Sequence, residues 1–195
     1  MFIYRYFERP HQFSTYHAEP RACDLCGHQR PGYDAGGFSD LDAVCEECLA
    51  GGRLAEGDAA TNVGDPKRLG EQVRQMRPEL TEGEVDAYVE ARTHELERRT
   101  PQLPSWQPFC WPVHCGDYCR YLKEVGRRDL TELASDGNGL AYFTEHDVTG
   151  LGGTAEVWST IRPDAPNNNA ISYGVGVYLF RCLSCGEYVI LWDCD

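Results

Sequence analysis

Residues 171–195, ISYGVGVYLFRCLSCGEYVILWDCD, place a Cys-x-x-Cys-Gly turn between two runs of β-prone residues. A strand, a thiol-bearing turn and a returning strand form the hairpin of a zinc ribbon, because two thiolates two residues apart can bind one ion from a tight turn. One such pair fills only half of a tetrahedral site. Cys182 and Cys185 therefore predict a second ligand pair elsewhere in the chain.

Three more closely spaced cysteine pairs occur upstream, two of the form Cys-x-x-Cys and one of the form Cys-x-x-x-Cys. The four pairs hold eight of the ten cysteines, which is the number that two four-thiolate sites require. Because this spacing is typical of zinc sites in intracellular proteins, we predict two zinc ions. The predicted ligands are Cys23, Cys26, Cys45 and Cys48 for the first site, and Cys115, Cys119, Cys182 and Cys185 for the second.

The two predicted sites differ in how far apart their ligand pairs lie. In the first site 18 residues separate Cys26 from Cys45, so His28 finds four cysteines already present and is interpreted as a surface histidine or a neighbour of the ligands. In the second site 62 residues separate the two pairs. There His114 precedes Cys115, and adjacent residues rarely both bind one tetrahedral ion. A set of three thiolates and one imidazole, with His114 in place of Cys115, therefore stays open as an alternative.

Two cysteines, Cys110 and Cys194, have no partner at metal-binding spacing, and we expect each to be a buried or free thiol. The N-terminus lacks the long apolar run of a signal peptide, and no stretch approaches the roughly 20 apolar residues of a membrane span. We therefore expect a cytoplasmic protein that is not bound to a membrane. In that compartment thiols stay reduced, which favours metal binding over disulfides.

Hydrophobic residues make up 42% of the 195 residues, enough for a packed core. We predict a small zinc-stabilised α+β protein with a C-terminal β-hairpin and a few helices. It has an N-terminal metal module (1–57), an acidic helical segment (58–100) and a second metal module (101–195), packed as one unit.

Local signals locate the elements of this fold. Asp65-Pro66 is typical of a helix start, and Thr81 with Glu84 forms the pattern of a capping box, with that helix ending near Arg99. We also predict a helix around 118–125 and β-prone pieces within 140–161.

The formal net charge is −13, and two four-thiolate zinc sites would bring it to about −17. Such a chain repels phosphate backbones, so we do not expect nucleic-acid binding. An acidic surface instead favours a basic protein partner and speeds its capture.

No phosphate-binding loop, serine-hydrolase elbow or His-Glu-x-x-His motif is present. Four thiolates also close a zinc site to water, so we expect structural rather than catalytic zinc. Two alternatives stay open: a metal- or thiol-dependent enzyme that uses His114 and Asp117, and a regulator that senses zinc or oxidants.

The order of these motifs resembles the bacterial CbrC family, a group of small cysteine-rich proteins. The resemblance covers most of the chain apart from about 58–80 and 128–170, and Cys110 and Cys194 depart from the family pattern. The segments that carry it are FIYRYFERP, CDLCG, CEECLAGG, RTP with SWQ, HCGDYCRYLKEVG and YLFRCLSCGEY.

The resemblance implies no reaction, since that family has none assigned. Its name is linked to colicin tolerance, which implies resistance to a bacterial toxin. Nuclease toxins tend to be basic and their inhibitors acidic, which agrees with the charge of this chain. We therefore expect a non-enzymatic, zinc-binding immunity or tolerance factor that binds a basic toxin domain.

Overall fold

The computed structural model describes residues 2–35, 41–105, 107–165 and 174–194. Within these ranges it contains seven α-helices and three small antiparallel sheets, which confirms the expected α+β class. The helices are α1 Pro10–Phe13, α2 Glu46–Ala50, α3 Pro66–Met76, α4 Glu82–Arg99, α5 Arg127–Leu133, α6 Gly139–His146 and α7 Thr154–Trp158. The strands are β1 Tyr16–Ala22, β2 Gln29–Asp34, β3 Ala43–Cys45, β4 Val113–His114, β5 Asp117–Tyr118, β6 Arg120–Glu124, β7 Val175–Arg181 and β8 Tyr188–Cys194.

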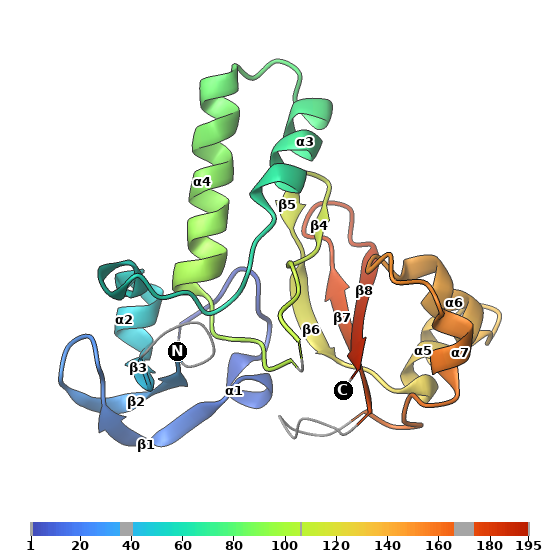
Figure 1. Ribbon diagram of the computed structural model, residues 1–195, viewed down its shortest axis with the longest axis horizontal. Coiled ribbons are helices and arrows are strands. Elements are labelled where there is room, and N and C mark those ends of the chain that lie inside the picture. The colour runs from blue at the N-terminus through green and yellow to red at the C-terminus, as the bar shows by residue number, and fades with distance from the viewer. Residues whose placement is uncertain (1, 36–40, 106, 166–173, 195) are drawn as a thin grey trace.

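Two sheets lie on opposite sides of the molecule, and the α3–α4 hairpin projects beyond them (Figure 1). The N-terminal sheet has the order β1-β2-β3, and the C-terminal sheet has the order β6-β7-β8. The small β4–β5 hairpin lies between α3 and the C-terminal sheet (Figure 1). The three helices α5, α6 and α7 pack together beside β8 (Figure 1).

The N-terminal sheet forms because β2 and β3 approach each other closely at the first metal module. Gly32 lies opposite Cys45 in the antiparallel register. A Cβ atom at position 32 would lie 2.3 Å from the Val44 carbonyl oxygen, so only glycine fits there. This close approach brings Cys45 against the turn that carries the first cysteine pair.

The helical hairpin begins and ends as its capping residues predict. The Asp65 carboxylate accepts a hydrogen bond from the Arg68 backbone N–H at 2.9 Å, with Pro66 in the first helical position. Thr81 and Glu84 form a capping box at the start of α4, which ends at Arg99. These predictions are confirmed.

The C-terminal hairpin is also confirmed. Strands β7 and β8 pair without a break from Val175 opposite Cys194 to Arg181 opposite Tyr188. Residues 171–173 of the expected first strand lie outside the described residues. Six of the seven residues of β7 are buried because β6 and β8 flank it and helices pack nearby.

Two predictions in the C-terminal half are wrong. Residues 120–124 form strand β6 rather than a helix, because they pair with β7 on one side and with the N-terminal segment at Phe7 on the other. The β-prone residues of 140–161 form α6 and α7. The Asn138 side chain caps α6 by accepting a hydrogen bond from the Ala141 N–H at 3.1 Å, so the chain begins a helix here.

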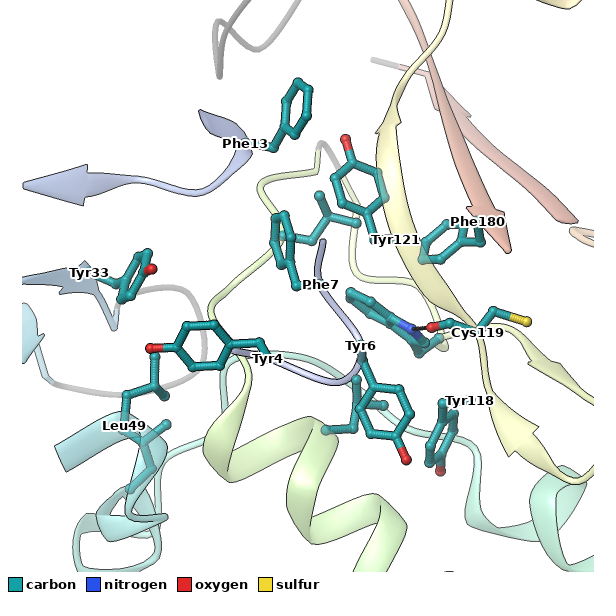
Figure 2. Close-up of a cluster of buried hydrophobic side chains, with 14 of the residues drawn as sticks. Tyr4, Tyr6, Phe7, Phe13, Tyr33, Leu49, Tyr118, Cys119, Tyr121 and Phe180 are labelled. Atoms are coloured by element: carbon teal, nitrogen blue, oxygen red, sulfur yellow. Dashed lines mark hydrogen bonds between the residues drawn. The ribbon is translucent and has the colours of Figure 1, made fainter. Parts of the chain in front are cut away.

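Aromatic side chains of the N-terminal segment join the two metal modules (Figure 2). Tyr4 packs edge-on against Tyr33 of β2, with ring centroids 6.0 Å apart, while Phe7 packs in the same way against Tyr121 of β6 at 5.0 Å. Such pairs contribute about 1 kcal/mol each beyond their buried area. The largest core cluster accordingly draws residues from 1–57, 58–100 and 101–195, whereas the second cluster lies within 101–195.

The buried carboxylate of Asp117 holds the N-terminal segment in its place between the two modules. The Asp117 side chain is 7% exposed and accepts hydrogen bonds from the Arg5 guanidinium at 2.5 Å and the Tyr6 hydroxyl at 2.8 Å. It also accepts one from the Tyr118 N–H at 2.9 Å. A buried charge is tolerated only when its partners satisfy it in this way. Asp117 thus ties the N-terminal segment to the β4–β5 hairpin.

Among the residues that the structure describes, none of the helices combines the length and the apolar character that a membrane span requires.

Replacing Asp117 with Ala should lower the free energy of unfolding by about 3 kcal/mol, because Arg5 and Tyr6 lose a buried partner. Asp164→Ala is the matched control: its partner is Arg128, both side chains are about two-thirds exposed, and its loss should cost less than about 1 kcal/mol. Urea denaturation of the metal-loaded proteins measures both values. Equal effects for the two variants would contradict the role assigned to Asp117.

Candidate metal centres

Four cysteines form centre 1. The sulfur atoms of Cys23, Cys26, Cys45 and Cys48 all lie within 4.8 Å of one another. Those of Cys26 and Cys45 are 3.9 Å apart, far beyond the length of about 2.05 Å of a disulfide bond. Four thiolates held about 2.3 Å from a central ion at tetrahedral angles are separated by about 3.8 Å. The cluster therefore has the dimensions of a tetrahedral thiolate site.

Each ligand of centre 1 is placed by a short element. Cys23 and Cys26 bracket a turn after β1 that is closed by a hydrogen bond from the Gly27 N–H to the Cys23 carbonyl at 2.7 Å. Cys45 ends β3, and Cys48 lies one turn along α2. The short helix α2 ends at Ala50, just before Gly51.

Backbone hydrogen bonds prepare one thiol of centre 1 for binding a cation. Burial opposes ionisation of Cys23, but N–H groups of Cys45, Leu25 and Cys26 donate to its sulfur and lower its pKa to about 7. Burial and the neighbouring thiols raise the pKa of Cys48 to about 12. A cation among the four sulfurs would favour ionisation of all of them.

Centre 2 contains a histidine. His114, Cys115, Cys182 and Cys185 place one ligand atom each within 4.8 Å of the others. The His114 Nδ1 and the Cys185 sulfur are 3.5 Å apart. A tetrahedral ion with one imidazole at about 2.05 Å and one thiolate at about 2.3 Å would separate these atoms by about 3.5 Å. Centre 2 thus has the dimensions of a site with three thiolates and one imidazole.

A tight turn brings adjacent residues to the same side of centre 2. Strands β4 and β5 pair His114 with Asp117, which leaves Cys115 and Gly116 as a two-residue loop. Both have positive φ angles, +53° and +70°, as a type I′ hairpin turn requires. Neighbouring residues of a straight strand point to opposite faces, but this left-handed turn allows both side chains to join one cluster.

The predicted ligand Cys119 lies outside this group. Its residue is fully buried, and its carbonyl oxygen accepts a hydrogen bond from the indole N–H of Trp111 at 2.7 Å. Figure 2 shows its sulfur pointing away from the labelled aromatic rings. Burial and the charges of nearby groups, Cys182 foremost, raise the pKa of the Cys119 thiol well above its usual range. The cluster thus has the ligand types of the open alternative, three thiols and one imidazole, but His114 takes the position expected for Cys119 rather than that of Cys115.

The thiols of centre 2 differ in environment. Burial opposes ionisation of Cys185, but the Glu187 backbone N–H and the neighbouring thiols stabilise its thiolate and lower its pKa. Burial and the thiols of Cys185 and Cys182 raise the pKa of Cys115 to about 12. Cys185 is exposed, whereas none of the ligands of centre 1 is exposed.

The remaining residues singled out by sequence lie outside both centres. His28 is exposed and belongs to neither group. Cys110 and Cys194 are free thiols, as expected, but both are exposed rather than buried. Asp117 lies opposite His114 in the hairpin, yet its carboxylate faces Arg5 and Tyr6.

One residue of centre 1 was not predicted from sequence. Arg53, at the start of the 3-10 helix Arg53–Gly57, donates a hydrogen bond from Nη1 to the Cys48 sulfur at 3.3 Å. Its other terminal nitrogen, Nη2, donates to the Leu25 carbonyl at 3.0 Å. The only signal in the sequence is a basic residue five positions after a ligand, which is too common to identify it.

Each of the two groups offers a complete tetrahedral set of ligand atoms for an ion. All ten cysteines are free thiols, and each group offers four ligand atoms. A tetrahedral ion with four protein ligands has no position left for water or substrate. Such a site stabilises the fold by joining distant turns.

His114→Ala and Cys119→Ala distinguish the two possible ligand sets of centre 2. We expect His114→Ala to lose about one metal ion per chain, whereas Cys119→Ala should retain both, because only His114 lies in the cluster. Native mass spectrometry of each purified variant gives the metal count. Loss of an ion from Cys119→Ala with retention in His114→Ala would contradict this assignment.

Metal binding at both centres should be coupled to folding. Replacing Cys45 or Cys182 with Ser should therefore lower the melting temperature far more than Cys110→Ser, since Cys110 lies outside both groups. Differential scanning calorimetry of the three variants makes the comparison. Equal melting temperatures would show that the clusters do not stabilise the fold through a bound ion.

Comparisons with known proteins place the chain among relatives without a known role. A family model described as an uncharacterised protein family, UPF0167, matches residues 1–194. The UPF0167 protein PA1536 of Pseudomonas aeruginosa is 28% identical over 195 residues, covering 94% of this chain and 92% of that protein. No solved structure matched the chain.

A mycobacterial relative is similar over the same extent. The UPF0167 protein Mb2317 of Mycobacterium bovis is 25% identical over 194 residues, covering 97% of this chain and 91% of that protein. The CbrC name does not occur among these matches, so that resemblance stays an expectation. Because the family model spans nearly the full length, the chain belongs to the uncharacterised protein family UPF0167.

Proposed function

We propose that this protein is a non-enzymatic zinc protein whose two closed centres hold a scaffold for binding another protein. The observation that carries the proposal is the pair of four-ligand clusters, each with ligand atoms within 4.8 Å. Tetrahedral sites rich in thiolate select zinc or iron–sulfur chemistry. A set of three cysteines and one histidine is common among structural zinc sites, which favours zinc for both centres.

The enzyme alternative has less support. A general acid or base must reach a substrate, but both carboxylate oxygens of Asp117 bind scaffold groups. His114 has its Nδ1 turned toward the Cys185 sulfur. These two residues therefore serve the hairpin and the centre rather than a shared catalytic cleft.

The charge of the molecule supports a basic protein partner. With zinc bound, centre 1 carries about −2 and centre 2 about −1, which takes the formal charge of −13 to about −16. Segments 1–57, 58–100 and 101–195 carry −4, −3 and −6 respectively. The excess is thus spread over the chain, and a partner would respond to the field of the whole molecule.

The helical hairpin contributes less to this field than its acidic residues suggest. Glu82 and Asp86 on α4 are exposed, but both pair with Arg74 of α3. Exposed pairs of this kind are largely screened by solvent. We therefore propose that the negative charge of the whole molecule attracts a basic partner and repels nucleic acids and membranes. No single acidic patch is assigned as the contact surface.

The more specific form of the proposal is a cytoplasmic immunity or tolerance factor that covers a basic bacterial toxin. It is supported by the acidity of the chain and by the resemblance to a family linked to colicin tolerance. An acidic inhibitor would capture a basic nuclease domain quickly and mask its nucleic-acid site.

Binding to purified nuclease domains of colicin-type toxins tests this function. We expect one of them to form a one-to-one complex whose association rate falls steeply as salt rises, because exposed charges steer the encounter. Stopped-flow fluorescence measures the rate, and hen lysozyme serves as an unrelated basic control. Absence of any complex, together with no protection of cells that express the protein, would contradict the proposal.

A further inference from the structure

The two centres differ in how their thiolates are shielded. In centre 1, Cys23, Cys45 and Cys48 are each no more than 4% exposed, and Cys26 is partly buried. In centre 2 only Cys182 is buried, and Cys185 is exposed on the tip of the β7–β8 turn. An incoming ligand can therefore reach an ion in centre 2 beside Cys185, whereas centre 1 is enclosed.

Among the described residues, an arginine side chain contacts a sulfur of centre 1 but not of centre 2. The Arg53 guanidinium donates to the Cys48 sulfur of centre 1 at 3.3 Å. In the part of the chain that the structure describes, no lysine or arginine hydrogen-bonds a thiol of centre 2, whose sulfur atoms contact backbone groups, His114 and one another. A charge-assisted hydrogen bond to a thiolate holds the sulfur in place and opposes its displacement from a bound ion.

Arg53 is held in this position by three oxygen atoms, which belong to Glu56 and Leu25. Its Nε and Nη2 donate to the two carboxylate oxygens of Glu56, each at 2.8 Å. Nη2 also donates to the Leu25 carbonyl, inside the turn between Cys23 and Cys26. One side chain thereby joins the turn of the first ligand pair to a sulfur of the second. Partners of this kind, which hold ligands from outside, commonly tune metal affinity.

We propose that centre 2 releases its ion to external thiolates or chelators. In centre 1 the hydrogen bond from Arg53 to the Cys48 sulfur slows the loss of the ion. This inference rests on the proposed zinc centres. In the exchange an incoming sulfur or nitrogen donor bonds to the ion while the bond to the Cys185 sulfur breaks. The Cys185 sulfur leaves with its electron pair, as a thiolate. No electron transfer is involved, so the reaction needs no oxidant.

Chelator competition on the intact protein tests the inference. The zinc content is first measured by native mass spectrometry, and a count of two supports the zinc centres themselves. Excess 4-(2-pyridylazo)resorcinol then removes zinc while its absorbance is followed. We expect two phases of equal amplitude. N-ethylmaleimide added after the first phase should label Cys115, Cys182 and Cys185 and leave the ligands of centre 1 protected, as peptide mapping reveals.

A variant of Arg53 tests whether its hydrogen bond slows the loss of the ion from centre 1. Arg53→Gln should speed the slow phase about tenfold, at the lower end of typical effects because this side chain is 39% exposed. The fast phase should not change. Arg128→Gln is the matched control, since Arg128 is an exposed arginine whose partner is Asp164, and it should alter neither phase.

Three results would overturn the inference: a single phase, early labelling of Cys23, Cys26, Cys45 and Cys48, or an unchanged slow phase in Arg53→Gln. A zinc count below two in every preparation would instead contradict the proposed zinc centres. If a variant fails to fold, the order in which the cysteines of the wild-type protein are labelled still shows which centre loses its ion first.

Discussion

Convergence of four ligand atoms at each of two points is the constraint on which the rest of this structure depends. Each set lies within 4.8 Å and comes from two turns that the chain must bring together. For centre 2 these turns are 62 residues apart or more, and the pairing of β6 with β7 brings them together. Closing such a loop costs conformational entropy that a bound ion offsets.

The N-terminal segment makes the two centres parts of one molecule. Tyr4 packs toward the sheet of centre 1, while Tyr6 and Phe7 pack toward the hairpin and sheet of centre 2 (Figure 2). Asp117 anchors this crossing within the β4–β5 hairpin. In the sequence, Asp117 lies near His114 and Cys115 and resembles part of a catalytic set. In the structure its carboxylate instead pairs with the Arg5 guanidinium and holds the fold together.

Sequence spacing predicted all four cysteines that cluster at centre 1 and three of the four residues that cluster at centre 2. The grouping of His114 with Cys115 was not predicted, because the rule that adjacent residues point to opposite faces fails at a turn with two positive φ angles. Caps such as Thr81 with Glu84 were predictable because their hydrogen bonds are local. Strand β6 was not, because its partners β7 and Phe7 lie far away in sequence. The role of Arg53 could not be predicted from the spacing of the cysteines, because it depends on the fold of a turn 28 residues earlier.

The coordination shell of the bound metal tests the central claim most directly. X-ray absorption at the zinc edge of the purified protein, combined with a metal count, reports the average ligands of both ions. Seven thiolates and one imidazole shared by two ions predict an average of about 3.5 sulfur and 0.5 nitrogen neighbours per zinc, with zinc–sulfur distances of about 2.3 Å. Fewer than two ions per chain, or a shell dominated by oxygen and nitrogen, would contradict it.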